Sequence, residues 1–177
     1  MILAFDSLQR KTIQEVLGRE KARVLTEMLE NTVPEDSRFV GMSREEIDDF
    51  FSLHRNELDF VAMLDIMSAA EAAIRSDYRK RLDKRLKDSV SKSFKKINKR
   101  LSKNKRSDKV SLEEDILDTW ATELLVAKGP VSDFKGALKL RDWLAHGRYW
   151  DPRMGRRQYS PHDVYDISNN LLQAIDA

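Results

Sequence analysis

The stretch from Arg141 to Trp150, RDWLAHGRYW, contains the residue types best suited to chemistry on a phosphodiester. Arg141 can bind a phosphate through a planar guanidinium that keeps its charge. His146, five positions later, can accept and donate a proton near neutral pH. Neither role requires a metal ion, so the pair suggests metal-free chemistry on a phosphodiester.

An amphipathic helix is expected to position this pair. Arg141 falls within the apolar side of that helix, so it must be paired or face a cleft or a partner. An ion pair with Glu71 is the structural alternative to phosphate binding. At 100° per residue, His146 lies about 140° around the helix from Arg141. The two would flank one groove, or act together where two copies of the helix meet. The apolar side comprises Phe134, Ala137, Leu138, Leu144 and Ala145, and Gly147 ends the pattern.

Asp142 precedes His146 by four positions, so its carboxylate can reach the imidazole, orient it and favour its protonated form. The alternative for His146 is a residue at a helix C-terminus that contacts the last carbonyls and the helix dipole. The spacing alone is not specific. Arg157 and His162 have the same spacing across the predicted start of another helix.

Helical periodicity runs through almost all of the 177 residues, and only six glycines and four prolines interrupt it. The predicted fold is therefore all-α: an up-and-down bundle of about five helices, one of them long and basic, in a single domain of residues 1–177. Residues 1–42 would form an N-terminal helix and a loop. Helices are expected over 6–31, from 43 into the basic stretch, over 111–128, over 132–147 and from 160 onward. Capping signals are Ser43, Ser111, Ser132 and Ser160–Pro161.

Composition excludes several classes of protein. The chain has no cysteine, so it forms neither disulfides nor thiolate zinc sites. It has no Gly-rich phosphate loop, no Glu-x-x-His pair and no apolar run of about 18 residues. We therefore expect a cytoplasmic protein without a metal, a cofactor or a membrane segment.

The net charge of +2 conceals a segregated basic stretch. Positions 79–109 hold 15 Lys/Arg and 3 Asp/Glu, against 17 and 27 in the rest of the chain. Such a stretch can attract a polyanion, or it can be a solvated, lysine-rich helix. Apolar residues also recur along it every three or four positions, which permits a coiled-coil arm. They are Tyr78, Leu82, Leu86, Val90, Phe94, Ile97 and Leu101.

Residues 141–147, RDWLAHG, resemble the Arg-x4–6-His motif of the HEPN superfamily. Residues 141–150 and 70–79 are similar to HEPN proteins of the RiboL-PSP-HEPN type. The resemblance covers roughly 43–177. It implies a compact helical bundle that dimerises, so that two Arg/His motifs form one cleft. It also implies a metal-independent endoribonuclease of a toxin–antitoxin or antiphage system. The expected partners are RNA, a second copy of the chain, and an antitoxin or other defence-system protein.

On this resemblance, Arg141 would bind the scissile phosphate and His146 would act as general acid/base during attack by the RNA 2′-hydroxyl. Asp142 would orient the histidine. The products would be a 2′,3′-cyclic phosphate and a 5′-hydroxyl. Glu71 and Arg75 would support the cleft, or would form a simple ion pair beside the motif helix.

The residues after the motif are candidates for RNA binding, because arginines and aromatic rings suit phosphates and unpaired bases. The same residues would suit a bundle end or a dimer interface. Some HEPN toxins have a tyrosine two positions after the histidine, which a partner nucleotidyltransferase modifies. An arginine stands there in this chain, so neutralisation by that route is not expected. The candidates are Arg148, Tyr149, Trp150 and Arg153.

Two other functions fit the sequence. The first is a non-catalytic HEPN module that binds nucleic acid or a partner protein, with Arg141 in a structural role. The second is a helical assembly adaptor that binds a partner helix along the apolar residues between Tyr78 and Leu101.

Overall fold

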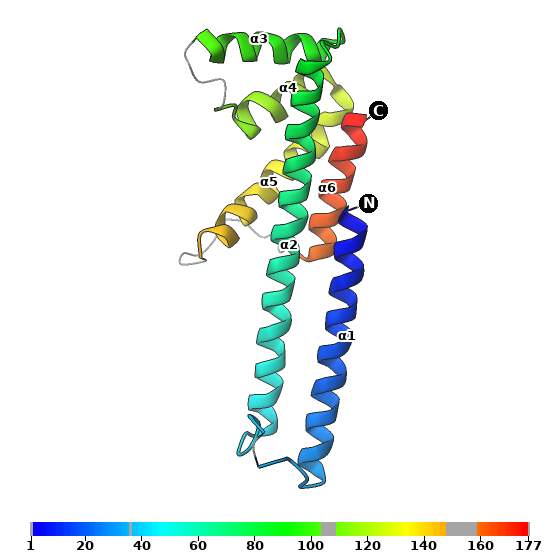
Figure 1. Ribbon diagram of the computed structural model, residues 1–177, viewed down its shortest axis with the longest axis vertical. Helices are drawn as coiled ribbons and strands as arrows, with labels where there is room; N and C mark the ends of the chain where they lie inside the picture. The colour runs from blue at the N-terminus through cyan, green and yellow to red at the C-terminus, as the bar shows by residue number, and fades with distance from the viewer. Residues whose placement is uncertain (1, 36, 104–108, 148–158, 177) are drawn as a thin grey trace. The chain divides into compact units, whose positions relative to one another are not determined.

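The chain is all-α, as predicted. The computed structural model describes residues 2–35, 37–103, 109–147 and 159–176, and these ranges contain helices and no strand (Figure 1). The α-helices are α1 (Ile2–Leu29), α2 (Arg44–Asp83), α3 (Ser89–Lys103), α4 (Asp118–Glu123), α5 (Lys128–Ala145) and α6 (Pro161–Asp176). A π-helical turn, η1 (Leu112–Leu117), leads into α4, and a 3₁₀ turn, η2 (Leu125–Ala127), leads into α5. None of the described helices is long and apolar enough to span a membrane.

The chain divides into two compact units, Met1–Ala62 and Met63–Ala177, and the division falls inside α2. In the first unit, α1 and the beginning of α2 run side by side (Figure 1). Lys21 pairs with Asp48 at 2.5 Å, and Gln14 Nε2 donates to Asp59 Oδ1 at 3.0 Å. The buried core of this unit consists of Val24, Phe39, Ile47 and Phe51.

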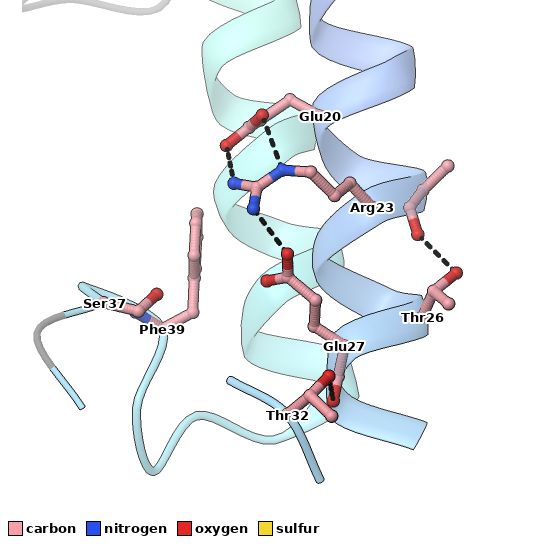
Figure 2. Close-up of polar contacts among 8 residues, drawn as sticks. Glu20, Arg23, Thr26, Glu27, Thr32, Ser37 and Phe39 are labelled. Carbon is pink, nitrogen blue, oxygen red and sulfur yellow. Dashed lines mark hydrogen bonds and ion pairs between the residues drawn. The ribbon is translucent and has the colours of Figure 1, made fainter. Parts of the chain in front are cut away.

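Short-range polar contacts define the end of α1 (Figure 2). Arg23 donates to Glu20 Oε1 at 2.8 Å and to Glu27 Oε1 at 2.5 Å. The Thr32 amide donates to the Glu27 carbonyl at 2.8 Å. Asn31 has φ +53°, the left-handed conformation that commonly ends a helix and that asparagine tolerates. The Asn31 amide also donates to the Met28 carbonyl at 3.2 Å, so the turn satisfies two of the last carbonyls of α1 as the helix ends.

The second unit has a larger core, built by α2 from Met63 onward and by the later helices. Its aromatic centre is a chain of edge-on rings, with centroid distances of 5.0 Å from Tyr78 to Phe94 and 5.9 Å from Phe94 to Trp120. Tyr78 and Phe94 belong to the predicted coiled-coil residues, as does buried Val90. Much of that apolar surface therefore packs inside the chain's own core and is not open to a partner helix. The largest fully buried side chains include Trp120, Phe94, Phe134, Ile74, Ile116, Leu138 and Leu171.

Of the two predicted capping boxes, the one at Ser43 is confirmed and the one at Ser111 differs in detail, while the predicted helix start at Ser160 is confirmed and proves to be a capping box as well. The Ser43 amide donates to Glu46 at 2.7 Å and the Glu46 amide to Ser43 Oγ at 3.2 Å. Ser160 and Asp163 make the same exchange at the start of α6, at 2.8 and 3.2 Å. Ser111 caps its helix as predicted, but its own amide donates to Asp115, at 2.9 Å, and not to the expected Glu114.

The prediction of one long basic helix is wrong. A turn separates α2 from α3, and Arg85 within it has φ +52°. Asp88 explains the new start, because it accepts hydrogen bonds from the amide and the hydroxyl of Ser91 at 3.0 and 2.7 Å. A new helix leaves the amides of its first turn without partners, and Asp88 at the N-cap satisfies that of Ser91.

The predicted boundary between the helices over 111–128 and 132–147 is also wrong. The break lies at Leu124, which is extended (φ −125°), and α5 begins at Lys128. Gly129 and Pro130 lie in the first turn of α5, where a proline costs no helical hydrogen bond because those amides have no partner in the helix. Ser132 is consequently inside α5 and does not cap it.

Candidate functional site

The C-terminal half of α5 carries the candidate site. Phe134, Ala137 and Leu138 are buried, as the apolar pattern predicted, whereas Leu144 is half-buried and Ala145 is exposed. The helix therefore emerges from the core toward its C-terminal end. Arg141 lies where this change occurs, and 30% of its side chain is exposed.

Arg141 reaches across to α2, where its Nη2 lies 3.4 Å from Glu71 Oε2. The other oxygen of the same carboxylate accepts a hydrogen bond from Arg75 Nε at 2.7 Å. Arg75 also donates from Nη1 to the Val110 carbonyl at 3.3 Å. Both predicted ion pairs, Arg141 with Glu71 and Arg75 with Glu71, are thus confirmed. The contact with Val110 could not be predicted from the sequence, because a backbone carbonyl carries no side-chain signature.

Glu71 is shared unequally between the two arginines. Its 2.7 Å contact with Arg75 is within the range of a strong charge-assisted hydrogen bond, and its 3.4 Å contact with Arg141 is beyond that range. Because Glu71 is mainly satisfied by Arg75, Arg141 is the more weakly held of the two guanidinium groups.

Asp142 provides the second contact of Arg141. Its Oδ1 lies 3.2 Å from Arg141 Nε, close enough for an ion pair. The direction of the N–H is unsuitable for a hydrogen bond, and this buried Nε–H has no acceptor among the described residues. A buried donor without an acceptor costs about 1–3 kcal/mol. Arg141 is therefore held by charge more than by hydrogen bonds.

His146 ends α5 and is exposed. Its amide donates to the Asp142 carbonyl at 3.1 Å, and its Nδ1 lies 2.6 Å from the same oxygen. A carbonyl oxygen can only accept, so Nδ1 carries the proton. In the neutral ring the lone pair is then on Nε2. The predicted alternative for His146, a contact with a carbonyl of the last helical turn, is confirmed.

Gly147 follows with φ +85°, and a Cβ built on it would meet nothing within 4 Å. The left-handed conformation, not crowding, is what favours glycine there, and it ends the helix directly after the histidine.

Asp142 contacts both members of the motif. Its carboxylate lies beside Arg141 and its carbonyl binds the ring of His146. Asp142 thus contacts the imidazole through its backbone carbonyl, whereas the sequence had suggested its carboxylate. Arg141 and His146 therefore share a contact with Asp142, which lies between them in the sequence.

The remaining candidate residues are the four predicted to bind RNA and His162. Arg148, Tyr149, Trp150 and Arg153 lie outside the described residues. His162, of the second Arg-x4-His spacing, is in the first turn of α6 and pairs with Asp166 at 3.0 Å, with 80% of its side chain exposed. Within the described ranges, no group of three or more His, Cys, Asp or Glu residues could hold a metal ion.

Comparison with known proteins adds no relative. No protein-family model, no curated protein and no solved structure matches this chain. The resemblance of residues 70–79 and 141–150 to HEPN proteins therefore stays a hypothesis that rests on those residues alone.

Proposed function

We propose that this protein is a metal-independent endoribonuclease of the HEPN type, acting as a homodimer in the cytoplasm as a toxin or antiphage effector. One observation carries the proposal. An exposed imidazole, His146, has its Nδ1 bound by a backbone carbonyl at 2.6 Å, five positions after a partly exposed arginine. That arrangement makes Nε2 the reacting nitrogen of the ring.

The chemistry is an attack of the RNA 2′-oxygen on the adjacent phosphorus, with cleavage of the bond from phosphorus to the 5′-oxygen. A neutral His146 takes the proton of the 2′-hydroxyl on Nε2, and a protonated His146 gives a proton to the departing 5′-oxygen. Two copies of the chain would supply one neutral and one protonated His146. Proton transfer by a positioned side chain typically contributes 10²–10⁴-fold to a rate.

Arg141 would bind the scissile phosphate. Its long contact with Glu71 supports this role, because a phosphate oxygen at a normal hydrogen-bond distance can replace a carboxylate at 3.4 Å. Arg75 would continue to hold Glu71 when Arg141 turns to the substrate. Arg75 and Glu71 then support the site without touching RNA.

The test is cleavage of a labelled RNA in EDTA by the wild type and by His146→Ala and Arg141→Ala variants. We expect the wild type to leave 2′,3′-cyclic phosphate ends and the His146→Ala rate to fall by about 10²-fold or more. His162→Ala is the matched control, since it removes another exposed histidine, the one that ends the second Arg-x4-His spacing. Cleavage that survives in His146→Ala, or that requires a divalent metal, contradicts the proposal.

A second function, a non-catalytic helical module with a structural Arg141, is favoured by the ion pair between Arg141 and Glu71. The two functions differ in what Arg141→Ala changes. In the module, the variant loses stability and the wild type cleaves no RNA. In the nuclease, the variant loses cleavage at a temperature where it is still folded.

A further inference from the structure

The outer face of α3 carries a row of exposed lysines, Lys92, Lys96, Lys99 and Lys103, here called the α3 lysine row. At 100° per residue these four positions fall within about 60° of one another around the helix. At 1.5 Å per residue the row extends about 16 Å. The row is thus a narrow line of positive charge, with a lysine at nearly every turn.

The opposite face of α3 fixes the direction of the row. Val90 and Phe94 are buried, and the Phe94 ring packs edge-on against Tyr78 and Trp120. Because this face is part of the core of the second unit, the helix cannot rotate to bury its lysines. The α3 lysine row therefore faces outward as a fixed surface.

The other two cations of α3 are already bound. Lys95 Nζ donates to the Leu86 carbonyl at 2.7 Å, and Arg100 pairs with Asp115 at 2.6 Å. By contrast, no carboxylate among the described residues pairs with any lysine of the row. Elsewhere in that part of the chain, cations with carboxylate partners include Lys21, Arg23, Arg75, Arg81, Lys135 and Arg141.

An uncompensated row has an energetic consequence. Lysines three or four positions apart on one helix face repel each other. A bound polyanion removes this repulsion, and its own counterions are released into solution. The surface is thus suited to a chain of regularly spaced negative charges.

We propose that the α3 lysine row binds the phosphodiester backbone of single-stranded nucleic acid. This inference deepens the proposed function and rests on it for the choice of RNA over DNA. The described side chains of the row are ammonium groups, without an aromatic ring for stacking on bases, so binding is independent of base sequence. The row would bind phosphates of the RNA other than the scissile one, which Arg141 would bind.

An anionic membrane is a poorer match for this surface. Helices that bind at a membrane surface insert an apolar face beside their basic residues. In α3 the apolar residues are buried or half-buried against the core, and Ser89, Ser102 and the lysines are exposed. Only charge is left to attract lipid.

The test compares Lys96→Gln/Lys99→Gln with the matched variant Arg44→Gln/Arg55→Gln. Both remove two exposed positive charges, and the second pair lies on α2 far along the chain from α3. Each is made in a His146→Ala background, and binding is measured by fluorescence anisotropy on labelled oligo(U) RNA, on oligo(dT) and on phosphatidylserine vesicles over a range of salt. Circular dichroism checks that helix content is unchanged.

Loss of two phosphate contacts should make the slope of log affinity against log salt shallower by about 1.4, since each single-strand contact contributes about 0.7. At 0.1 M salt this corresponds to a roughly 25-fold weaker affinity for RNA. The control variant should bind like the wild type. Equal slopes for the two variants, or tighter binding of vesicles than of RNA, would overturn the inference. Tighter binding of oligo(dT) than of oligo(U) would assign the row to DNA and overturn the choice of RNA.

A separate assay distinguishes a failure of the inference about the α3 lysine row from a failure of the proposed function. With His146 intact, cleavage of the dinucleotide UpA depends on a single phosphodiester and should be unaffected by Lys96→Gln/Lys99→Gln, whereas KM for long RNA should rise about 25-fold. If the wild type cleaves neither substrate, the nuclease proposal fails and the anisotropy measurement still decides the binding surface.

Discussion

Glu71 of α2 and Arg141 of α5 are joined by an ion pair of 3.4 Å, although they are far apart in the sequence. Glu71 is held more tightly by Arg75, at 2.7 Å on its own helix. One carboxylate thus links α2 to the helix that carries His146. The pairing fixes the direction of α5 where its packing against the core becomes loose.

Replacement of Glu71 by glutamine should destabilise the second unit. Glutamine keeps the size of the side chain but leaves two arginines without their shared counter-charge. Since the groups are 21–35% exposed, we expect a loss of about 1–2 kcal/mol, below the 3–5 kcal/mol of a fully buried pair. The melting temperature should fall by roughly 2–8 °C. Urea unfolding measures the change.

Glu30→Gln is the control for this prediction, because Glu30 is exposed after the end of α1. Its stability should stay within about 0.5 kcal/mol of the wild type. If Glu71→Gln and Glu30→Gln unfold at the same urea concentration, the ion-pair network contributes nothing to stability.

Asp88 should make the stability of the protein depend on pH in acid. Partial burial opposes its ionisation, but hydrogen bonds from Ser91 and the charge of Arg81 outweigh this and lower the pKa of Asp88 below 3.8. A carboxylate with a lowered pKa stabilises the fold above its unfolded value, and the effect is lost as pH falls through its folded value. Asparagine caps a helix about as well as aspartate but lacks its charge, so Asp88→Asn should cost about 0.3–1 kcal/mol at pH 7.

The difference between wild type and Asp88→Asn should shrink as pH falls below about 4, which thermal melts between pH 2.5 and 7 can follow. Asp65→Asn provides a comparison, because Asp65 is exposed on α2. A constant difference between wild type and Asp88→Asn across this range would show that the helix cap does not depend on ionisation.

Tyr78→Phe should leave the protein equally stable or more stable at pH 7. Tyr78 is 5% exposed, and its hydroxyl is buried without a partner among the described residues. Removing an unsatisfied hydroxyl should therefore add up to about 1 kcal/mol. The Phe94 ring contact at 5.0 Å is kept by phenylalanine.

Tyr78 should also make the protein lose stability at alkaline pH. Burial raises the pKa of Tyr78 above 10, and the charge of Asp115 adds to this. A raised pKa gives stability that is present below pH 10 and is lost as pH rises through the folded value. Wild type should lose stability faster than Tyr78→Phe above pH 10 in denaturant titrations. Tyr165→Phe, at a half-buried position of α6, serves as the comparison, and parallel curves for wild type and Tyr78→Phe would refute the prediction.

Features that depend on local chemistry were predictable from the sequence. Ser43 and Ser160 start helices because their side chains satisfy amides only three positions away. The pairing of Arg141 with Glu71 was also predictable, since a charge in an apolar stripe requires a partner.

Features that depend on distant packing were not predictable. No glycine or proline marks the break at Leu124, which lies just before the fully buried Ala127. Arg85 adopts positive φ without the glycine or asparagine that usually signals it. The contact between His146 and the Asp142 carbonyl was hidden for another reason, because every residue has a carbonyl.

The backbone conformation of Gly147 is one in which the handedness of the amino acid matters. Its φ of +85° is natural for mirror-image amino acids and strained for ordinary ones, while the space around it is open. At this point a D-alanine introduced by chemical synthesis would suit the backbone better than an L-alanine. The conformation that ends α5 directly after His146 thus depends on the handedness of residue 147 more than on the size of its side chain.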